Sequence, residues 1–169
     1  MINNNIFLIG MMGSGKSTIA PQLSQALELP CIDTDQDILS VLDSKISDIS
    51  ELKFRQLESV YFLERIKNDY CVYATGGGII LSEKNRESIQ SHGIGIFLDT
   101  SIDVLHERLI NTNLDTRPLL NKINLKKQLN IILKDRKEYY ESCAKIKICT
   151  NNLLKEEVVE KIITELQNL

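Results

Sequence analysis

The segment from Gly10 to Ser17 constrains this chain more than any other. It reads Gly-Met-Met-Gly-Ser-Gly-Lys-Ser, which satisfies the spacing G-x-x-x-x-G-K-[ST] in full, and it follows the apolar run 6–9. This context predicts a phosphate-binding loop, because glycines let backbone N–H groups approach an anion without Cβ clashes. The alternative is a glycine-rich turn with an incidental lysine, but the spacing arises by chance in well under about one in fifty chains of this length. The segment therefore predicts nucleotide binding.

The residues of this loop have separate expected roles. Lys16 would reach the β- and γ-phosphates of a nucleoside triphosphate as a point charge, while the Ser17 hydroxyl would ligate the Mg²⁺ that bridges them. The full set expected to bind the nucleotide from this segment is Gly13, Ser14, Gly15, Lys16, Ser17 and Thr18.

Composition narrows the remaining possibilities. The 169 residues are 43% hydrophobic and 25% charged, which is typical of one globular domain, here taken as 1–169. The net charge of −3 gives no basic field, so no nucleic-acid partner is expected. The N-terminal residues match neither a signal peptide nor a membrane span, and the four cysteines form no Cys-x-x-Cys pair, so we expect a cytoplasmic protein with reduced thiols and no membrane contact. The sequence shows no heptad pattern of a coiled coil, so a monomer is the simplest expectation.

Short apolar runs alternate with helical patterns along the chain. The expected strands are 6–9, 30–32, 71–74, 94–98 and 146–149, and the expected helices are 18–27, 51–68, 83–91, 102–111, 124–142 and 154–167. Strands that alternate with helices predict a parallel sheet covered on both faces. Ligands of such sheets bind at the carboxyl ends of the strands.

Three carboxylates follow the second expected strand, in Asp33-Thr34-Asp35-Gln36-Asp37. They could simply form the acidic first turn of a helix. They could also serve phosphoryl transfer, one holding a metal-bound water while another orients an attacking hydroxyl. The helix interpretation explains Asp37 better, and the catalytic interpretation explains Asp33 and Asp35 better.

A triple glycine, Gly76-Gly77-Gly78, follows the third expected strand. It could be a flexible turn, but its position at the same sheet edge as the phosphate loop favours a ligand role. Arg55, Arg117 and Arg136 are further candidates, although a single arginine is usually a solvated charge. Arg117 follows a polar, poorly periodic segment that is typical of a lid, and a lid cation can meet charge on a transferring phosphate.

Together these motifs resemble those of the shikimate kinases from about residue 5 to about residue 150. They are the phosphate loop, Asp33-Thr34-Asp35, Phe54-Arg55-x-x-Glu58, Gly76-Gly77-Gly78, Arg117-Pro118-Leu119-Leu120 and Arg136-x-x-x-Tyr140-x-x-x-Ala144. The loop is common to many nucleotide kinases, whereas the other five motifs in this order are specific. The resemblance implies an α/β, three-layer P-loop kinase fold with a five-stranded parallel sheet flanked by helices. It also implies a small substrate-binding helical region at about 33–62 and a lid at about 111–121.

The resemblance implies transfer of the γ-phosphoryl group of ATP to the 3-hydroxyl of shikimate, with Mg²⁺, in aromatic amino-acid biosynthesis. Lys16 and the lid Arg117 would stabilise charge on the phosphoryl oxygens. Asp33 would support the Mg²⁺ shell, often through water, and Asp35 would bind the ring hydroxyls and orient or deprotonate the attacking one.

The resemblance also implies how the substrate is held. Arg55 and Arg136 would clasp the shikimate carboxylate, for which a planar guanidinium is well suited. Gly77 and Gly78 would approach the substrate by backbone, with Gly76 shaping the turn, and Glu58 would anchor Arg55.

The chain departs from the family pattern in three places. The segment 48–53 is short and lacks the Gly-Glu pair that the family usually carries before Phe-Arg, which leaves the shape of the substrate region open. Ile110 stands where some members have a basic residue near the adenine, and Arg108 is a candidate substitute. Glu138 replaces a proline found in many members.

Two other functions remain as alternatives. A kinase of another small polyol, such as gluconate, would share the phosphate loop but would not need both arginines and the Arg-Pro-Leu-Leu lid. A non-catalytic ATP-binding module would be expected to lose Asp35 or Arg117, and both are present.

Overall fold

A five-stranded parallel sheet forms the centre of the computed structural model, which describes residues 4–42, 50–67, 70–112, 120 and 122–169. The strand order is β2-β3-β1-β4-β5, and every neighbouring pair is parallel. The central strand β1 (Asn5–Ile9) lies between β3 (Val72–Ala74) and β4 (Gly93–Asp99). The edge strands are β2 (Cys31–Asp33) and β5 (Ile146–Cys149).

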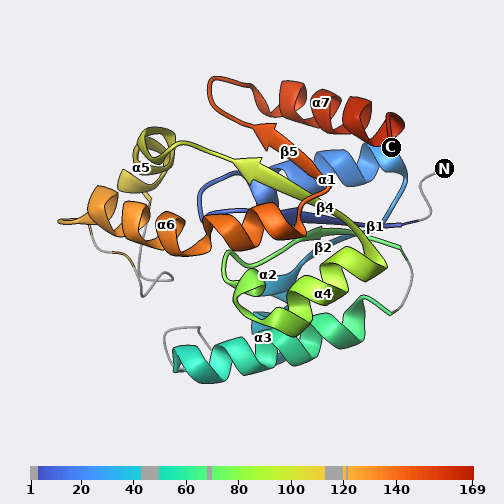
Figure 1. The fold of residues 1–169 in the computed structure, drawn as a ribbon, viewed down its shortest axis with the longest axis horizontal. Coiled ribbons are helices and arrows are strands. Elements are labelled where there is room, and N and C mark those ends of the chain that lie inside the picture. The colour runs from blue at the N-terminus through green and yellow to red at the C-terminus, as the bar shows by residue number, and fades with distance from the viewer. Residues whose placement is uncertain (1–3, 43–49, 68–69, 113–119, 121) are drawn as a thin grey trace.

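Helices cover both faces of this sheet (Figure 1). They are α1 (Lys16–Leu27), α2 (Thr34–Leu42), α3 (Glu51–Arg65), α4 (Glu83–His92), α5 (Ile102–Ile110), α6 (Leu125–Cys143) and α7 (Lys155–Gln167), with a short 3₁₀ turn η2 (Ile79–Leu81) before α4. A serine begins three of them: Ser50, Ser82 and Ser101 each accept a hydrogen bond from the backbone N–H three residues on. Such a cap stabilises a helix by about 1 kcal/mol.

Side chains of β1 alternate between two separate cores. Because successive side chains of a strand point to opposite faces, Phe7 and Ile9 lie in one apolar cluster and Ile6 and Leu8 in the other. The first cluster is completed mainly by α3, α4, α5 and α6, and the second by α1 and α7. β1 is buried throughout, as expected for a central parallel strand. The three-layer arrangement follows from these two cores.

The expected order of elements is confirmed with one omission. All five strands lie within one residue of their expected bounds, and α1 and α3–α7 match the six expected helices. The omission is α2, which begins at Thr34, directly after β2. The acidic segment 33–37 is therefore the start of a helix as well as the end of a strand.

The parallel arrangement brings the polar segments of the sequence to one edge of the sheet. The phosphate loop follows β1, Asp33 ends β2, the glycine turn 76–78 follows β3, and Thr150 follows β5. These carboxyl ends lie side by side because neighbouring strands run in the same direction.

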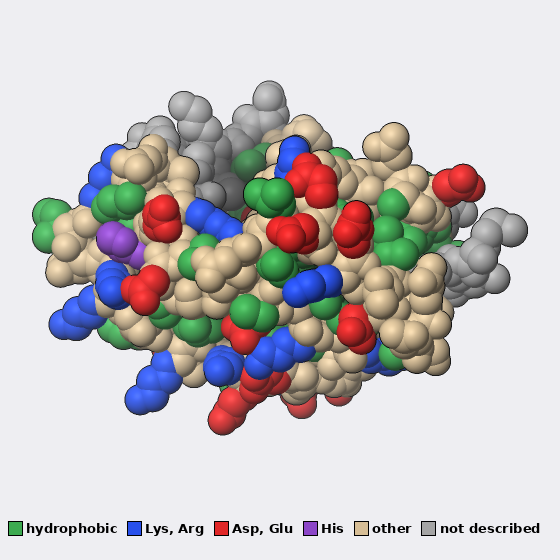
Figure 2. Space-filling view, turned by 90° about the horizontal axis from the view of Figure 1, so that it is seen from above, with side chains coloured by type: hydrophobic (Ala, Val, Ile, Leu, Met, Phe, Trp, Pro, Cys, Tyr) green, Lys and Arg blue, Asp and Glu red, His purple; other side chains and the backbone are tan. Residues whose placement is uncertain are grey.

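Acidic and basic side chains are intermingled on the face shown in Figure 2. Within the described residues, no helix combines the length and the apolar character needed to cross a membrane.

Candidate functional site

The phosphate loop connects β1 to α1 through glycines with left-handed backbone conformations. Gly13 has φ 80°, and a Cβ there would lie 3.0 Å from the side chain of Leu109. Gly10 has φ 144°, and a Cβ there would lie 2.9 Å from the carbonyl oxygen of Leu98. A non-glycine residue at either position would therefore be strained by its conformation and by its neighbours.

Lys16, the first residue of α1, folds over its own loop. Its Nζ atom donates hydrogen bonds to the carbonyl oxygens of Gly10 and Met11, both at 2.8 Å, and lies 3.5 Å from Ser14 Oγ. The side chain is buried, whereas the following Ser17 and Thr18 are exposed. The loop thus holds a cation at its centre and presents two hydroxyl groups at its rim.

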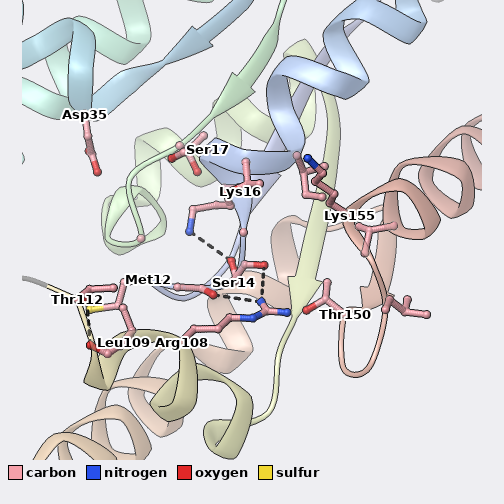
Figure 3. A pocket seen from close by; sticks show the side chains of 18 residues that line it. Met12, Ser14, Lys16, Ser17, Asp35, Arg108, Leu109, Thr112, Thr150 and Lys155 are labelled. Carbon is pink, nitrogen blue, oxygen red and sulfur yellow. Dashed lines mark hydrogen bonds between the residues drawn. The ribbon is translucent and has the colours of Figure 1, made fainter.

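A cavity of about 430 Å³ opens over this loop. Arg108 and Leu109 of α5 line one part of it, and Thr150 and Lys155 line another. Figure 3 shows Asp35 at the opposite side of the cavity from Thr150 and Lys155, with Lys16 between them. The cavity is therefore elongated from the carboxylate of α2 to the polar groups around α5 and α7.

Arg108 approaches the loop from α5. Its Nη1 atom donates to the carbonyl oxygens of Gly13 at 3.2 Å and Ser14 at 3.4 Å (Figure 3). Ile110, two residues further on, does not line the cavity. Arg108 is therefore a basic side chain of α5 that reaches the phosphate loop.

The three carboxylates of the acidic segment have different surroundings in the structure. Asp33 Oδ1 accepts hydrogen bonds from the backbone N–H groups of Asp35 and Gln36, both at 3.2 Å, and so begins α2. Asp37 Oδ2 accepts a hydrogen bond from the Tyr61 hydroxyl at 2.6 Å, which ties α2 to α3. Burial, followed by this hydrogen bond, raises the pKa of Tyr61 to about 12. Of the three carboxylates, Asp35 lines the cavity.

Thr34 fixes the position of the Asp35 backbone. Its buried hydroxyl donates to the carbonyl oxygen of Ala74 at 3.4 Å and accepts from the N–H of Gly76 at 3.0 Å. The start of α2 is thereby joined to the start of the glycine turn.

The glycine turn makes room for charged side chains. A Cβ at Gly76 would lie 2.6 Å from Asp35 Oδ1 and would overlap Glu58 Oε1. A Cβ at Gly78 would overlap the guanidinium carbon of Arg55. These two positions exclude larger residues because charged groups already occupy the space.

Arg55 and Glu58 form an ion pair on one turn of α3. Arg55 Nη1 lies 2.7 Å from Glu58 Oε2, and the Glu58 side chain is 1% exposed while that of Arg55 is 27% exposed. Burial raises the pKa of Glu58; Arg55 opposes this shift, and the nearby Asp35 adds to it. The Arg55 side chain thus remains partly exposed while it pairs with a buried carboxylate.

Arg136 reaches the same turn from α6. It is buried, and its Nη1 atom donates to the carbonyl oxygen of Gly77 at 3.1 Å. Arg55 and Arg136 therefore flank consecutive residues of the glycine turn, although their positions in the sequence are 81 residues apart.

The structure thus gathers most of the residues proposed from the sequence. Lys16, Asp35, Gly77 and the loop residues 13–18 line the cavity, and Arg55, Gly76, Gly78 and Arg136 adjoin it through the contacts above. Asp33 does not line the cavity. Arg117 and most of the expected lid lie outside the described residues. The sequence reasoning assigned no part in the site to Lys155 or Thr150, which belong to none of the motifs quoted above. It also assigned none to Thr34, although Thr34 lies within the Asp33-Thr34-Asp35 motif.

Comparison with known proteins gives a consistent result. The family model "Shikimate kinase" matches residues 12–167. A shikimate kinase from Rippkaea orientalis is 39% identical over 163 residues, which cover 94% of this chain and 86% of that protein. The structure of a shikimate kinase from Acinetobacter baumannii in complex with shikimate is similar, with a TM-score of 0.92 and 31% identity, covering 98% of this chain and 93% of that one. A gluconokinase from Sinorhizobium meliloti has a TM-score of 0.69 at 20% identity, with 98% and 93% covered, which is a likeness of fold.

Proposed function

The chain belongs to the shikimate kinase family and is an ATP-dependent phosphotransferase, and we propose that it phosphorylates shikimate with the residues at the carboxyl edge of its sheet. The reaction transfers the γ-phosphoryl group of ATP to the 3-hydroxyl of shikimate and gives shikimate 3-phosphate and ADP. The observation that carries the assignment of the site is the convergence of Arg55 and Arg136 on the glycine turn beside the phosphate loop.

ATP would occupy the cavity over the loop. Its phosphates would be surrounded by residues 13–18, and Lys16 would exchange its bonds to the Gly10 and Met11 carbonyl oxygens for bonds to the phosphoryl oxygens. Arg108, Thr150 and Lys155 would lie toward the nucleoside end, since they line the side of the cavity away from Asp35. Arg117 would add a second positive charge at the transferring group.

Mg²⁺ fits the oxygen donors available beside the loop. Ser17 presents an exposed hydroxyl to the cavity, and Asp33 ends strand β2 at the same edge of the sheet. The described residues hold no cluster of three or more His, Cys, Asp or Glu side chains that could cage a metal by themselves. This suits Mg²⁺, which keeps several waters and binds through few protein ligands together with phosphates. Ser17 would hold the ion directly and Asp33 through water, and the ion would neutralise charge on the phosphates.

The shikimate carboxylate would lie between Arg55 and Arg136. A guanidinium can form two parallel hydrogen bonds to a carboxylate, and burial strengthens such charge-assisted bonds. Glu58 would hold Arg55 in place, since Glu58 Oε2 lies 2.7 Å from Arg55 Nη1. The backbone of the glycine turn 76–78 would lie against the shikimate ring, which it can approach closely because glycine has no side chain.

Asp35 would then face the reacting hydroxyl. It lies beside Gly76 and lines the cavity over the phosphate loop, so a hydroxyl of the bound ring would meet the γ-phosphate near it. A carboxylate in this position can orient the hydroxyl and accept its proton as the new P–O bond forms.

We further propose that the enzyme acts as a monomer in the cytoplasm. All four cysteines, Cys31, Cys71, Cys143 and Cys149, are free thiols in the structure. Reduced thiols are the usual state in that compartment.

A coupled assay of ADP release tests the proposed function. Shikimate should stimulate ADP release well above the rate without acceptor, and gluconate should not. Stimulation by gluconate instead would support the polyol-kinase alternative, and equal rates in all three mixtures would support a non-catalytic module.

A further inference from the structure

One carbonyl oxygen at the centre of the glycine turn accepts two hydrogen bonds from α6. Gly77 O accepts from the Tyr140 hydroxyl at 2.5 Å and from Arg136 Nη1 at 3.1 Å. The two donors lie one helical turn apart, so they point from the same face of α6. A carbonyl oxygen has two lone pairs, and both are used here by one helix.

Tyr140 is held rigidly. Its side chain is 0% exposed, and its ring stacks on Phe97 of β4 with centroids 5.2 Å apart and an interplanar angle of 17°. Burial raises the pKa of Tyr140 to about 12, and the protonated hydroxyl donates a hydrogen bond to Gly77 O. The ring of Tyr140 is therefore packed against the sheet while its hydroxyl contacts the glycine turn.

Gly77 also lies against the phosphate loop. A Cβ at this residue would be 3.4 Å from the backbone nitrogen of Met12 and 3.5 Å from the carbonyl oxygen of Gly10. The Tyr140 hydroxyl itself lies 3.9 Å from Met11 Sδ. Gly77 is thus confined between α6 on one side and the loop on the other.

We propose that Tyr140 is a positioning residue for substrate binding, which fixes the Gly77 carbonyl and through it the guanidinium of Arg136. Without the hydroxyl, Gly77 O would keep Arg136 as its donor from α6, and the guanidinium could rotate toward the vacated space. The edge of Arg136 that faces the substrate carboxylate would then lose its alignment. This inference rests on the proposed function, because it assumes that Arg136 binds that carboxylate.

Steady-state kinetics of Tyr140→Phe test the proposal. The variant removes one oxygen atom and keeps the ring that stacks on Phe97. The KM for shikimate should rise about three- to tenfold, the range expected for loss of one buried hydrogen bond, while the KM for ATP should change less than about twofold. Calorimetric titration with shikimate should show the same loss.

Tyr73→Phe is the matched control. Tyr73 is also 0% exposed, and its hydroxyl donates to a backbone carbonyl oxygen, that of Arg65, at 3.3 Å. This control should leave both KM values near those of the parent, whatever it does to the melting temperature. A lowered melting temperature of Tyr140→Phe with an unchanged KM for shikimate would overturn the proposal, because it would make Tyr140 a purely structural residue.

The double variant with Arg136→Lys adds an independent criterion. If Tyr140 acts through Arg136, its replacement should raise the KM for shikimate much less in the Arg136→Lys background than in the parent. Equal factors in both backgrounds would contradict the proposal. Absence of shikimate-stimulated turnover in the parent protein would instead refute the proposed function, so the two failures are distinguishable.

Discussion

Arg55 and Glu58 are joined by an ion pair at 2.7 Å in which the Glu58 side chain is buried and the Arg55 side chain is partly exposed. Leaving a buried carboxylate without its partner is costly, so the pair is held together by the environment of Glu58. The consequence is a guanidinium that stays next to Gly78 before any substrate binds. Such preorganisation lowers the entropic cost of binding an anion.

Replacing Glu58 with Gln should change how stability depends on pH. The native pKa of Glu58 is raised above its ordinary value of 4.5, chiefly by burial, so the native protein binds this proton more tightly than the unfolded chain does. The contribution to stability is full below about pH 4.5 and is lost as pH rises through the native pKa. The free energy of unfolding of the parent, relative to Glu58→Gln, should therefore fall as pH rises through this window. Urea denaturation of both proteins across pH 4 to 8 measures this difference in the free energy of unfolding. A difference that stays constant with pH, or one that grows in favour of the parent as pH rises, would argue against the raised pKa.

Lys16→Met should abolish nearly all turnover. The lysine charge is proposed to act on the transferring phosphoryl group, and clamps of this kind are worth roughly 10³-fold or more in rate. Lys126→Met is a suitable control, because Lys126 pairs with Asp103 on the surface at 2.6 Å and is 58% exposed. Turnover of Lys16→Met within tenfold of the Lys126 control would exclude the proposed role.

Asp35→Asn should separate binding from chemistry. The variant should retain ATP binding because the phosphate loop is untouched, but it should lose about 10²- to 10⁴-fold in kcat because an amide cannot accept the hydroxyl proton. Asp37→Asn is the control, since Asp37 bonds to Tyr61 and should affect stability more than turnover. Comparable loss of kcat in both variants would show that the catalytic carboxylate has been misassigned.

Local patterns in the sequence were sufficient to predict the sheet. Runs such as 6–9 and 94–98 are apolar and bounded by glycine or polar residues. Such a continuous apolar run is the pattern expected of a parallel strand that is buried on both faces. The acidic segment suggested the start of α2 as one of two interpretations, but α2 was not among the expected helices because its nine residues give little periodicity. The phosphate loop was predictable because its chemistry depends on residues adjacent in sequence.

The contacts that complete the site depend on long-range packing. Tyr140 and Gly77 are 63 residues apart, and Arg108 and Gly13 are 95 residues apart. Periodicity places Tyr140 on the same face of α6 as Arg136, which indicates a shared environment, but no local signal identifies the carbonyl oxygen that both contact. The register of α6 against the glycine turn is set by the core around Phe97, which only the folded chain defines.

Calorimetry of shikimate binding to Arg136→Lys tests the central claim, that Arg136 binds the substrate carboxylate. Shikimate should bind the variant roughly tenfold more weakly or worse, because an ammonium cannot reproduce the two parallel bonds of a guanidinium, and ATP affinity should stay nearly constant. An analogue in which the carboxylate is reduced to an alcohol should bind the parent poorly.

The four affinities, of both ligands for both proteins, form a double-mutant cycle. The account predicts that the analogue loses little more affinity in Arg136→Lys, because the interaction is already gone. If the two losses simply add, Arg136 does not contact the carboxylate.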